Sequence, residues 1–259
     1  MTATPSVTLL GLGEAGAAIA AGLVERGVVT RAWDPDSVRT VAGVERAASA
    51  AEGAAAADVV LSLNAQSAAL GAASSVAEVL TARHLYADLN TTSPAVKREV
   101  GAAIAPSGAA FADVALLGPV PGKGLSTPCL ASGPGAARFA EIFGGLGMPV
   151  ETVGGEAGEA AARKLLRSVF MKGLAAAALE SLAAASAAGQ ERWLRDEILA
   201  VLHDADRALL DRLLEGSHRH ARRRADEMDA AAELVAELGL EPRVAAAARD
   251  LLRSLDSGV

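Results

Sequence analysis

The feature that most constrains this chain is a glycine-rich turn close to its N-terminus, Gly11-Leu12-Gly13-Glu14-Ala15-Gly16. A short apolar run precedes the turn, and an alanine-rich segment typical of a helix follows it. Strand, glycine turn and helix in this order are typical of a dinucleotide-binding unit, because the glycines permit a tight turn and a close backbone approach to a pyrophosphate. The helix N-terminus offers N–H groups and a positive dipole end to that anion. We expect all six residues to contact the cofactor.

An acidic residue follows where such a unit uses one. A second β-branched run ends at Asp34, close to the spacing of about 20 residues at which a carboxylate accepts hydrogen bonds from the ribose hydroxyls. We therefore predict NAD as the cofactor. NADP is the alternative, because Arg31 and Arg39 lie nearby in the sequence.

Strand and helix patterns alternate over residues 6–153, which predicts an α/β fold with a Rossmann-type doubly wound parallel sheet. Leu63 and Asn64 close one buried strand at the carboxyl edge, where such sheets bind ligands. Beyond the first two strands, the expected strands are 43–45, 58–63, 84–89, 111–116, 129–132 and 150–153, and the later helices are 37–41, 48–57, 71–81, 94–105 and 136–146.

The strand pattern ends near Gly154-Gly155, and the rest of the chain is predicted to be all-helical. We therefore place a dinucleotide-binding Rossmann domain at residues 1–154 and a helical substrate and dimerisation domain at residues 155–259. Small residues cover all faces of the segment 156–188, and a domain of about 100 residues cannot easily cover such a helix alone. We expect a homodimer through the helical domain. The remaining helices are expected at 191–203, 204–215, 217–238 and 242–255.

Composition excludes several other classes of protein. The net charge of −7 argues against binding to nucleic acid, and the single cysteine, Cys129, excludes an internal disulfide. We find no signal peptide and no uncharged apolar run of membrane-spanning length, so we expect no membrane partner and a cytoplasmic location. The histidines, acids and cysteine show no metal-ligand spacing, so we expect no metal site.

Four motifs, taken together, resemble the β-hydroxyacid dehydrogenase family, which includes 3-hydroxyisobutyrate dehydrogenases and, more distantly, 6-phosphogluconate dehydrogenase. The helical half is similar to a branch with a divergent phosphogluconate dehydrogenase-like C-terminal domain. The resemblance implies a hydride transfer between nicotinamide and a small, anionic hydroxy acid or its oxo counterpart. The motifs are the glycine turn, Asp88-Leu89-Asn90-Thr91, Asp113-Val114-Ala115-Leu116-Leu117-Gly118, and Gly155-x-x-Gly158 followed by Lys164.

The resemblance also implies roles for single residues. Lys164 would be the general acid/base, and Ser168, one turn later, a second catalytic donor. The cofactor loop would contribute Asn90 and Thr91. The substrate loop would contribute Leu117, Gly118 and Pro119.

The chain departs from the family pattern at several positions. Asn90 and Leu117 replace serines, Ser168 replaces an asparagine, and a C-terminal lysine is absent. Arg223, in the run 222–224, could replace that lysine, although such a run most often forms a solvated helix face. Two other functions stay open: an imine reductase on the same scaffold, which usually lacks the lysine, and a non-catalytic dinucleotide sensor.

Overall fold

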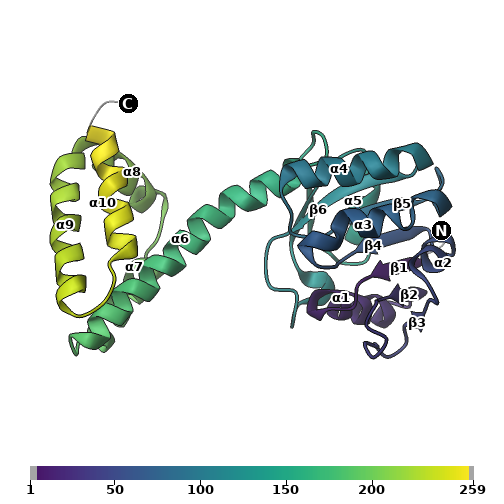
Figure 1. Ribbon diagram of the computed structural model, residues 1–259, viewed down its shortest axis with the longest axis horizontal. Helices are drawn as coiled ribbons and strands as arrows, with labels where there is room; N and C mark the ends of the chain where they lie inside the picture. The colour runs from purple at the N-terminus through teal and green to yellow at the C-terminus, as the bar shows by residue number, and fades with distance from the viewer. Residues whose placement is uncertain (1–4, 257–259) are drawn as a thin grey trace. The chain divides into compact units, whose positions relative to one another are not determined.

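The computed structural model describes residues 5–256 (Figure 1). The chain divides into two compact units, with the boundary between Arg167 and Ser168. This boundary falls inside one long helix, which begins in the first unit and continues into the second.

The first unit is built around an eight-stranded sheet of order β3-β2-β1-β4-β5-β6-β7-β8. All neighbouring strands are parallel except β6 and β7, which are antiparallel. The chain between these two strands forms only one short 3-10 turn, η4 (Gly124–Ser126), and no crossover helix. A parallel pair needs such a crossover, so the chain returns in the opposite direction. The strands are β1 (Val7–Leu10), β2 (Thr30–Trp33), β3 (Glu45–Arg46), β4 (Val59–Ser62), β5 (Leu85–Asp88), β6 (Ala110–Leu116), β7 (Cys129–Ser132) and β8 (Val150–Thr152).

Helices cover both faces of the sheet, and each face has its own apolar core. Ile19 of α1 and Phe139 of α5 pack on one face, and Ala73 of α3 and Val100 of α4 pack on the other. The central strands β1 and β4 are mostly apolar because both of their faces are buried. The helical elements are α1 (Glu14–Glu25), α2 (Ala50–Ala55), η1 (Gln66–Ala68), α3 (Ala69–Ser74), η2 (Ala77–Val79), α4 (Pro94–Ile104), η3 (Ala105–Ser107) and α5 (Ala136–Gly145).

The predicted sheet and most of its helices are confirmed, including the start of α4, where the Ser93 hydroxyl accepts a hydrogen bond from the Val96 amide at 3.3 Å. The helix expected at 37–41 is wrong. The guanidinium of Arg46 binds the backbone carbonyls of Asp34 and Arg39 at 2.5 and 3.1 Å, and these contacts hold the segment as a turn.

The helix expected at 71–81 is also different in the structure. It starts earlier, as α3, and the chain continues as turns and the short η2. The Ser75 hydroxyl donates to the Ala72 carbonyl at 2.8 Å, which competes with helical hydrogen bonding at this point.

The second unit is helical throughout its described part, as predicted. Its helices α9 and α10 pack together and are joined through Gly239, whose φ of +79° closes the first of them. The carboxylate of Glu180 accepts from the amides of Val244 and Ala245 at 2.8 and 2.9 Å, which ties α6 to the start of α10. The helices are α6 (Glu159–Ala187), shared with the first unit, α7 (Glu191–His203), α8 (Arg207–Arg219), α9 (Ala221–Glu237) and α10 (Arg243–Asp256).

Among the described residues, α6 is the one helix that is long and apolar enough to cross a membrane by length and composition. Lys172 and Glu180 interrupt its apolar sequence. The expected absence of a membrane partner stays a prediction.

Candidate functional site

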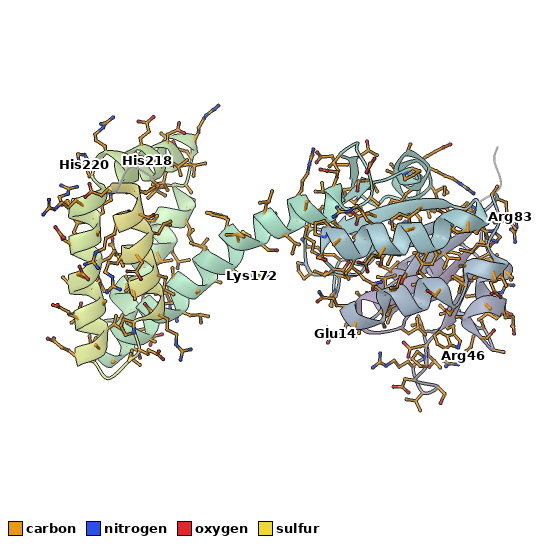
Figure 2. All side chains as sticks on the ribbon, turned by 45° about the horizontal axis from the view of Figure 1, so that its top comes forward. Glu14, Arg46, Arg83, Lys172, His218 and His220 are labelled. Carbon is orange, nitrogen blue, oxygen red and sulfur yellow. The ribbon has the colours of Figure 1, made fainter. Side chains whose placement is uncertain are left out.

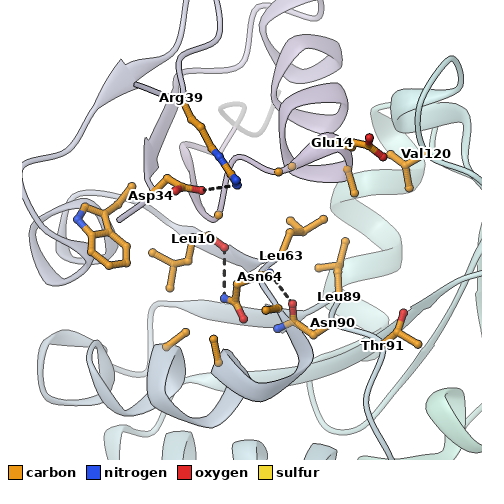
Figure 3. A pocket seen from close by; sticks show the side chains of 18 of the residues that line it. Leu10, Glu14, Asp34, Arg39, Leu63, Asn64, Leu89, Asn90, Thr91 and Val120 are labelled. Carbon is orange, nitrogen blue, oxygen red and sulfur yellow. Dashed lines mark hydrogen bonds and ion pairs between the residues drawn. The ribbon is translucent and has the colours of Figure 1, made fainter. Parts of the chain in front are cut away.

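A cavity of about 790 Å³ lies in the first unit at the carboxyl edge of the sheet (Figure 3). Its walls come from the loops that follow β1, β2, β4, β5 and β6 and from the start of α6. Ten of the eleven residues predicted to bind the cofactor line it: Gly11, Gly13, Glu14, Ala15, Gly16, Asp34, Leu63, Asn64, Asn90 and Thr91. Lys164 and Gly118 line it as well.

The three glycines of the turn meet different surroundings. A Cβ on Gly16 would lie 2.1 Å from the carbonyl oxygen of Gly11, and one on Gly11 would lie 2.0 Å from that of Leu63. Both positions therefore need glycine so that α1 can pack closely on the sheet. At Gly13 the nearest atom to such a Cβ is Nη1 of Arg39, at 3.8 Å. Gly13 thus leaves room on the cavity side of the turn, as a pyrophosphate requires.

Asp34 is buried at the end of β2, and its carboxylate is fixed by two backbone amides. Oδ2 accepts from the amide of Leu12 at 2.6 Å, and Oδ1 accepts from that of Asp36 at 2.9 Å. Leu12 itself does not line the cavity; its contribution is this amide. Nη1 of the half-exposed Arg39 lies 3.7 Å from Oδ2 of Asp34 (Figure 3). One end of the cavity therefore has both an acid and a cation.

Asn64 and Asn90 hold the next two loops together. The Asn64 amide donates to Oδ1 of Asn90 at 2.6 Å, and both side chains donate to the Ser62 hydroxyl, at 3.0 and 2.9 Å. The side-chain oxygen of Asn64 is buried and has no protein partner among the described residues. A buried acceptor without a partner is costly, and a ligand that donates to it would remove that cost.

Lys164 reaches the cavity from the second turn of α6. Its Nζ donates to the Thr91 hydroxyl at 2.7 Å, so an amine that can exchange a proton lies beside the predicted cofactor loop. This contact joins residues 73 positions apart in the sequence.

Other predicted site residues are not brought into this cavity. Leu117 packs beside the small apolar cluster of Ala115, Leu130 and Ala160, while Pro119 is absent from the described lining. From the end of β6 and the loop after it, Leu116, Gly118 and Val120 line the cavity.

Ser168 and Arg223 belong to the helical unit and are not among the residues that line this cavity. The Arg223 guanidinium lies 3.5 Å from the Glu227 carboxylate, one turn along α9. The catalytic and substrate-binding roles of both residues stay predictions.

Sequence reasoning missed part of the wall. Trp33 at the end of β2 lines the cavity, and β3 rather than β2 forms the edge of the sheet. Asp113, the first residue of the third family motif, lies inside β6. Its Oδ2 accepts from the amides of Gly158 and Ala161 at 3.0 and 3.1 Å and so holds the start of α6. The signal available in the sequence was an acid within a strand together with the later Gly-x-x-Gly before a helix.

Cys129 is buried in β7, and burial raises the pKa of its thiol to about 12. The thiol is therefore protonated near neutral pH and is not a nucleophile.

No group of three or more histidine, cysteine, aspartate or glutamate side chains within residues 5–256 could hold a metal ion. The exposed histidines His218 and His220 lie near each other in the helical unit (Figure 2).

The open backbone at Gly13, the fixed carboxylate of Asp34 and the buried acceptor on Asn64 fit a dinucleotide, and they define a Rossmann-type binding protein. The chain belongs to the family of the NAD binding domain of 6-phosphogluconate dehydrogenase, which matches residues 6–155. Residues 185–255 match a domain of unknown function, DUF1932. The chain therefore carries an NAD(P)-binding, oxidoreductase-like scaffold.

Several proteins are similar over most of the chain. A solved conserved hypothetical protein from Sinorhizobium meliloti is 32% identical, covers 97% of this chain and 88% of its own, and has a TM-score of 0.65. The conserved protein MTH1747, described as structurally similar to 3-hydroxyacid dehydrogenases, is 30% identical, with 97% and 98% covered and a TM-score of 0.61.

Two further similarities are more distant. An uncharacterized protein from Methanothermus fervidus is 28% identical over 176 residues, which are 66% of each chain. An imine reductase from Myxococcus stipitatus, solved with NADP+, shares the fold at 20% identity, with 98% and 95% covered and a TM-score of 0.84. At this identity the likeness concerns the fold alone.

Proposed function

We propose that this protein is an NAD(P)-dependent oxidoreductase that transfers a hydride between nicotinamide and a small hydroxy acid or its oxo counterpart. One observation carries the proposal: the amine of Lys164 and the glycine turn line the same cavity. A group that exchanges protons and a dinucleotide site are the two components that this reaction needs.

The chain's own residues would bind and orient the dinucleotide. The glycine turn and the start of α1 would hold the pyrophosphate, and Asp34 would accept from the ribose hydroxyls. Asn64 and Asn90, whose two loops are joined by a hydrogen bond, would limit how far the dinucleotide enters the cavity. When bound, the dinucleotide supplies or accepts the hydride at its nicotinamide ring.

Lys164 would hold and move the proton. Its Nζ donates to Thr91, and this contact fixes the position of the amine beside the cofactor loop. During oxidation of a hydroxyl group, a neutral Lys164 would take the proton from the hydroxyl oxygen while the hydride leaves the carbon that bears this oxygen. During reduction, the protonated amine would return it to the oxo oxygen.

The test combines binding with turnover. Reduced NAD and reduced NADP are titrated while nicotinamide fluorescence is followed, and the protein is then assayed with a panel of hydroxy acids, oxo acids and cyclic imines. We expect binding and turnover with at least one hydroxy or oxo acid. Turnover with imines alone would support an imine reductase, and binding without any turnover would support a dinucleotide sensor; either result contradicts the proposal.

A further inference from the structure

Lys97 of α4 is a buried cation that the proposed reaction does not use. Its side chain is only 1% exposed, and its Nζ lies 3.2 Å from Oδ2 of Asp88 and 3.2 Å from Oδ1 of Asp113. Nζ also donates to the backbone carbonyl of Asp88 at 2.6 Å. The ammonium group therefore makes one hydrogen bond and two ion pairs, and the two carboxylates belong to neighbouring strands, β5 and β6.

From Asp113 the contacts lead to the start of α6. Oδ2 of Asp113 accepts from the amides of Gly158 and Ala161 and from the Ser132 hydroxyl at 3.0, 3.1 and 3.1 Å. The Ser132 hydroxyl accepts in turn from the amide of Ala160 at 3.0 Å. Side chains of the sheet thus bind three backbone amides at the start of α6, those of Gly158, Ala160 and Ala161. Lys164 follows within one turn of Ala161, so the same contacts set where its side chain emerges.

From Asp88 the contacts lead to the cofactor loop. Oδ1 of Asp88 accepts from the backbone amide of Asn90 at 3.0 Å and from its side-chain amide at 2.5 Å. Asn90 then accepts from the Asn64 amide, and Thr91, the next residue, receives the hydrogen bond of Lys164. Both ends of the network therefore meet at the contact between Lys164 and Thr91.

The charges of this network depend on one another. Burial raises the pKa of Asp88, and the ammonium of Lys97 opposes that shift. The carboxylate of Asp113 also lies against the N-terminus of α6, which carries a partial positive charge. Removal of the Lys97 ammonium would leave two buried carboxylates beside each other with no cation between them. Either one carboxylate would have to take up a proton, or the two strands would have to rearrange.

We propose that Lys97 is a positioning residue, and that its bridge between Asp88 and Asp113 fixes the amine of Lys164 against the Thr91 hydroxyl. This inference rests on the proposed function for the importance of Lys164. Its test does not measure turnover, so a failure here and a failure of the proposed activity are distinguishable.

The experiment follows the reaction of Lys164 with trinitrobenzenesulfonate by peptide mass spectrometry between pH 7 and 10. Lys172, an exposed lysine later on α6 (Figure 2), is the internal reference. In Lys97→Met we expect Lys164 to react about fivefold faster relative to Lys172, the factor that corresponds to the loss of one hydrogen bond. Thr91→Val, which removes the hydroxyl directly, should give the same increase, and Glu99→Gln, an exposed position on α4, should give none.

A second probe separates positioning from general loosening. Cys129 is buried in β7, so its reaction with Ellman's reagent reports opening of the whole first unit. We expect the Cys129 rate to stay close to wild type while the Lys164 rate rises. Parallel increases at both residues, or an unchanged Lys164 rate in folded Lys97→Met, would overturn the proposal. If Lys97→Met does not fold, Lys97→Met/Asp88→Asn removes one charge of each sign, and the same criteria apply to it.

Discussion

In the first unit Leu9 and Leu61 of the central strands are completely buried, whereas Leu199 and Leu213 of the helical unit are 58% and 52% exposed. Helices α7 and α8 have no buried residue in the described single chain. Even the charged Lys97, Asp88 and Asp113 are buried in the first unit. Exposed apolar side chains in such number are typical of a surface that binds another chain, so we expect the helical unit to be the one that makes such a contact.

The largest expected effect tests the chemistry assigned to the first unit. In Lys164→Met, turnover should fall by about 10²–10⁴-fold, the usual contribution of a positioned proton-transfer group. Cofactor affinity should hardly change, because the glycine turn and Asp34 bind the dinucleotide. Steady-state kinetics and fluorescence titration measure the two quantities.

Lys164→Arg distinguishes proton transfer from charge. Arginine keeps the positive charge but does not deprotonate near neutral pH. Full turnover in this variant would remove Lys164 from the mechanism. A raised KM with normal kcat in Lys164→Met would assign it to substrate binding instead.

The exposed leucines lead to the second prediction, a homodimer through the helical unit. Light scattering at micromolar concentration should give about twice the mass of 26.0 kDa. Leu213→Glu should weaken the dimer by about 10²-fold or more, because a symmetric interface contains this leucine twice.

The matched control is Leu70→Glu. Leu70 is a leucine of α3 in the first unit that is 40% exposed. Its replacement should leave the mass unchanged. A monomeric wild-type protein would refute the dimer, and an equal effect of both substitutions would contradict its location.

The third prediction uses the different surroundings of the glycines. Gly16→Ala should lower the free energy of unfolding by about 1–3 kcal/mol, because its Cβ would overlap the Gly11 carbonyl oxygen. Gly13→Ala has open space, so its melting temperature should stay close to wild type while dinucleotide affinity falls about tenfold through the lost approach of the backbone.

Gly173→Ala extends this comparison to the helical unit. Apart from its two chain neighbours and the nearby backbone of its own helix, no atom of the described chain lies within 4 Å of an added Cβ, so the monomer should gain about 0.5–1 kcal/mol of stability. Destabilisation there would indicate a close neighbour from a second copy. Chemical denaturation at several protein concentrations measures the difference.

The smallest expected effect concerns cofactor choice. We expect several-fold tighter binding of NAD than of NADP, because the buried carboxylate of Asp34 repels a 2′-phosphate. Asp34→Asn should reduce this preference and Arg39→Met should increase it, since Arg39 is the cation nearest to that carboxylate in the cavity wall. A wild-type protein that prefers NADP would assign the dominant role to Arg39.

Local patterns in the sequence were sufficient for the sheet and for much of the cavity. The order of apolar run, glycine turn and helix predicted β1 and α1, and the spacing to Asp34 predicted the acid beside them. The helix expected at 94–105 is α4, which has Ser93 as its N-cap and Pro94 as its first residue. These features depend on neighbours in the chain, and the sequence shows such neighbours directly.

The tertiary structure alone decided three other features. The antiparallel direction of β7 depends on the missing crossover after β6. The wall position of Trp33 depends on the order of the strands. The bridge of Lys97 joins Asp88 and Asp113 on two neighbouring strands, and a sequence pattern shows these only as separate charged residues. A buried charge is stable only where its partners converge from several elements, and this convergence is a property of the packed sheet rather than of any local segment.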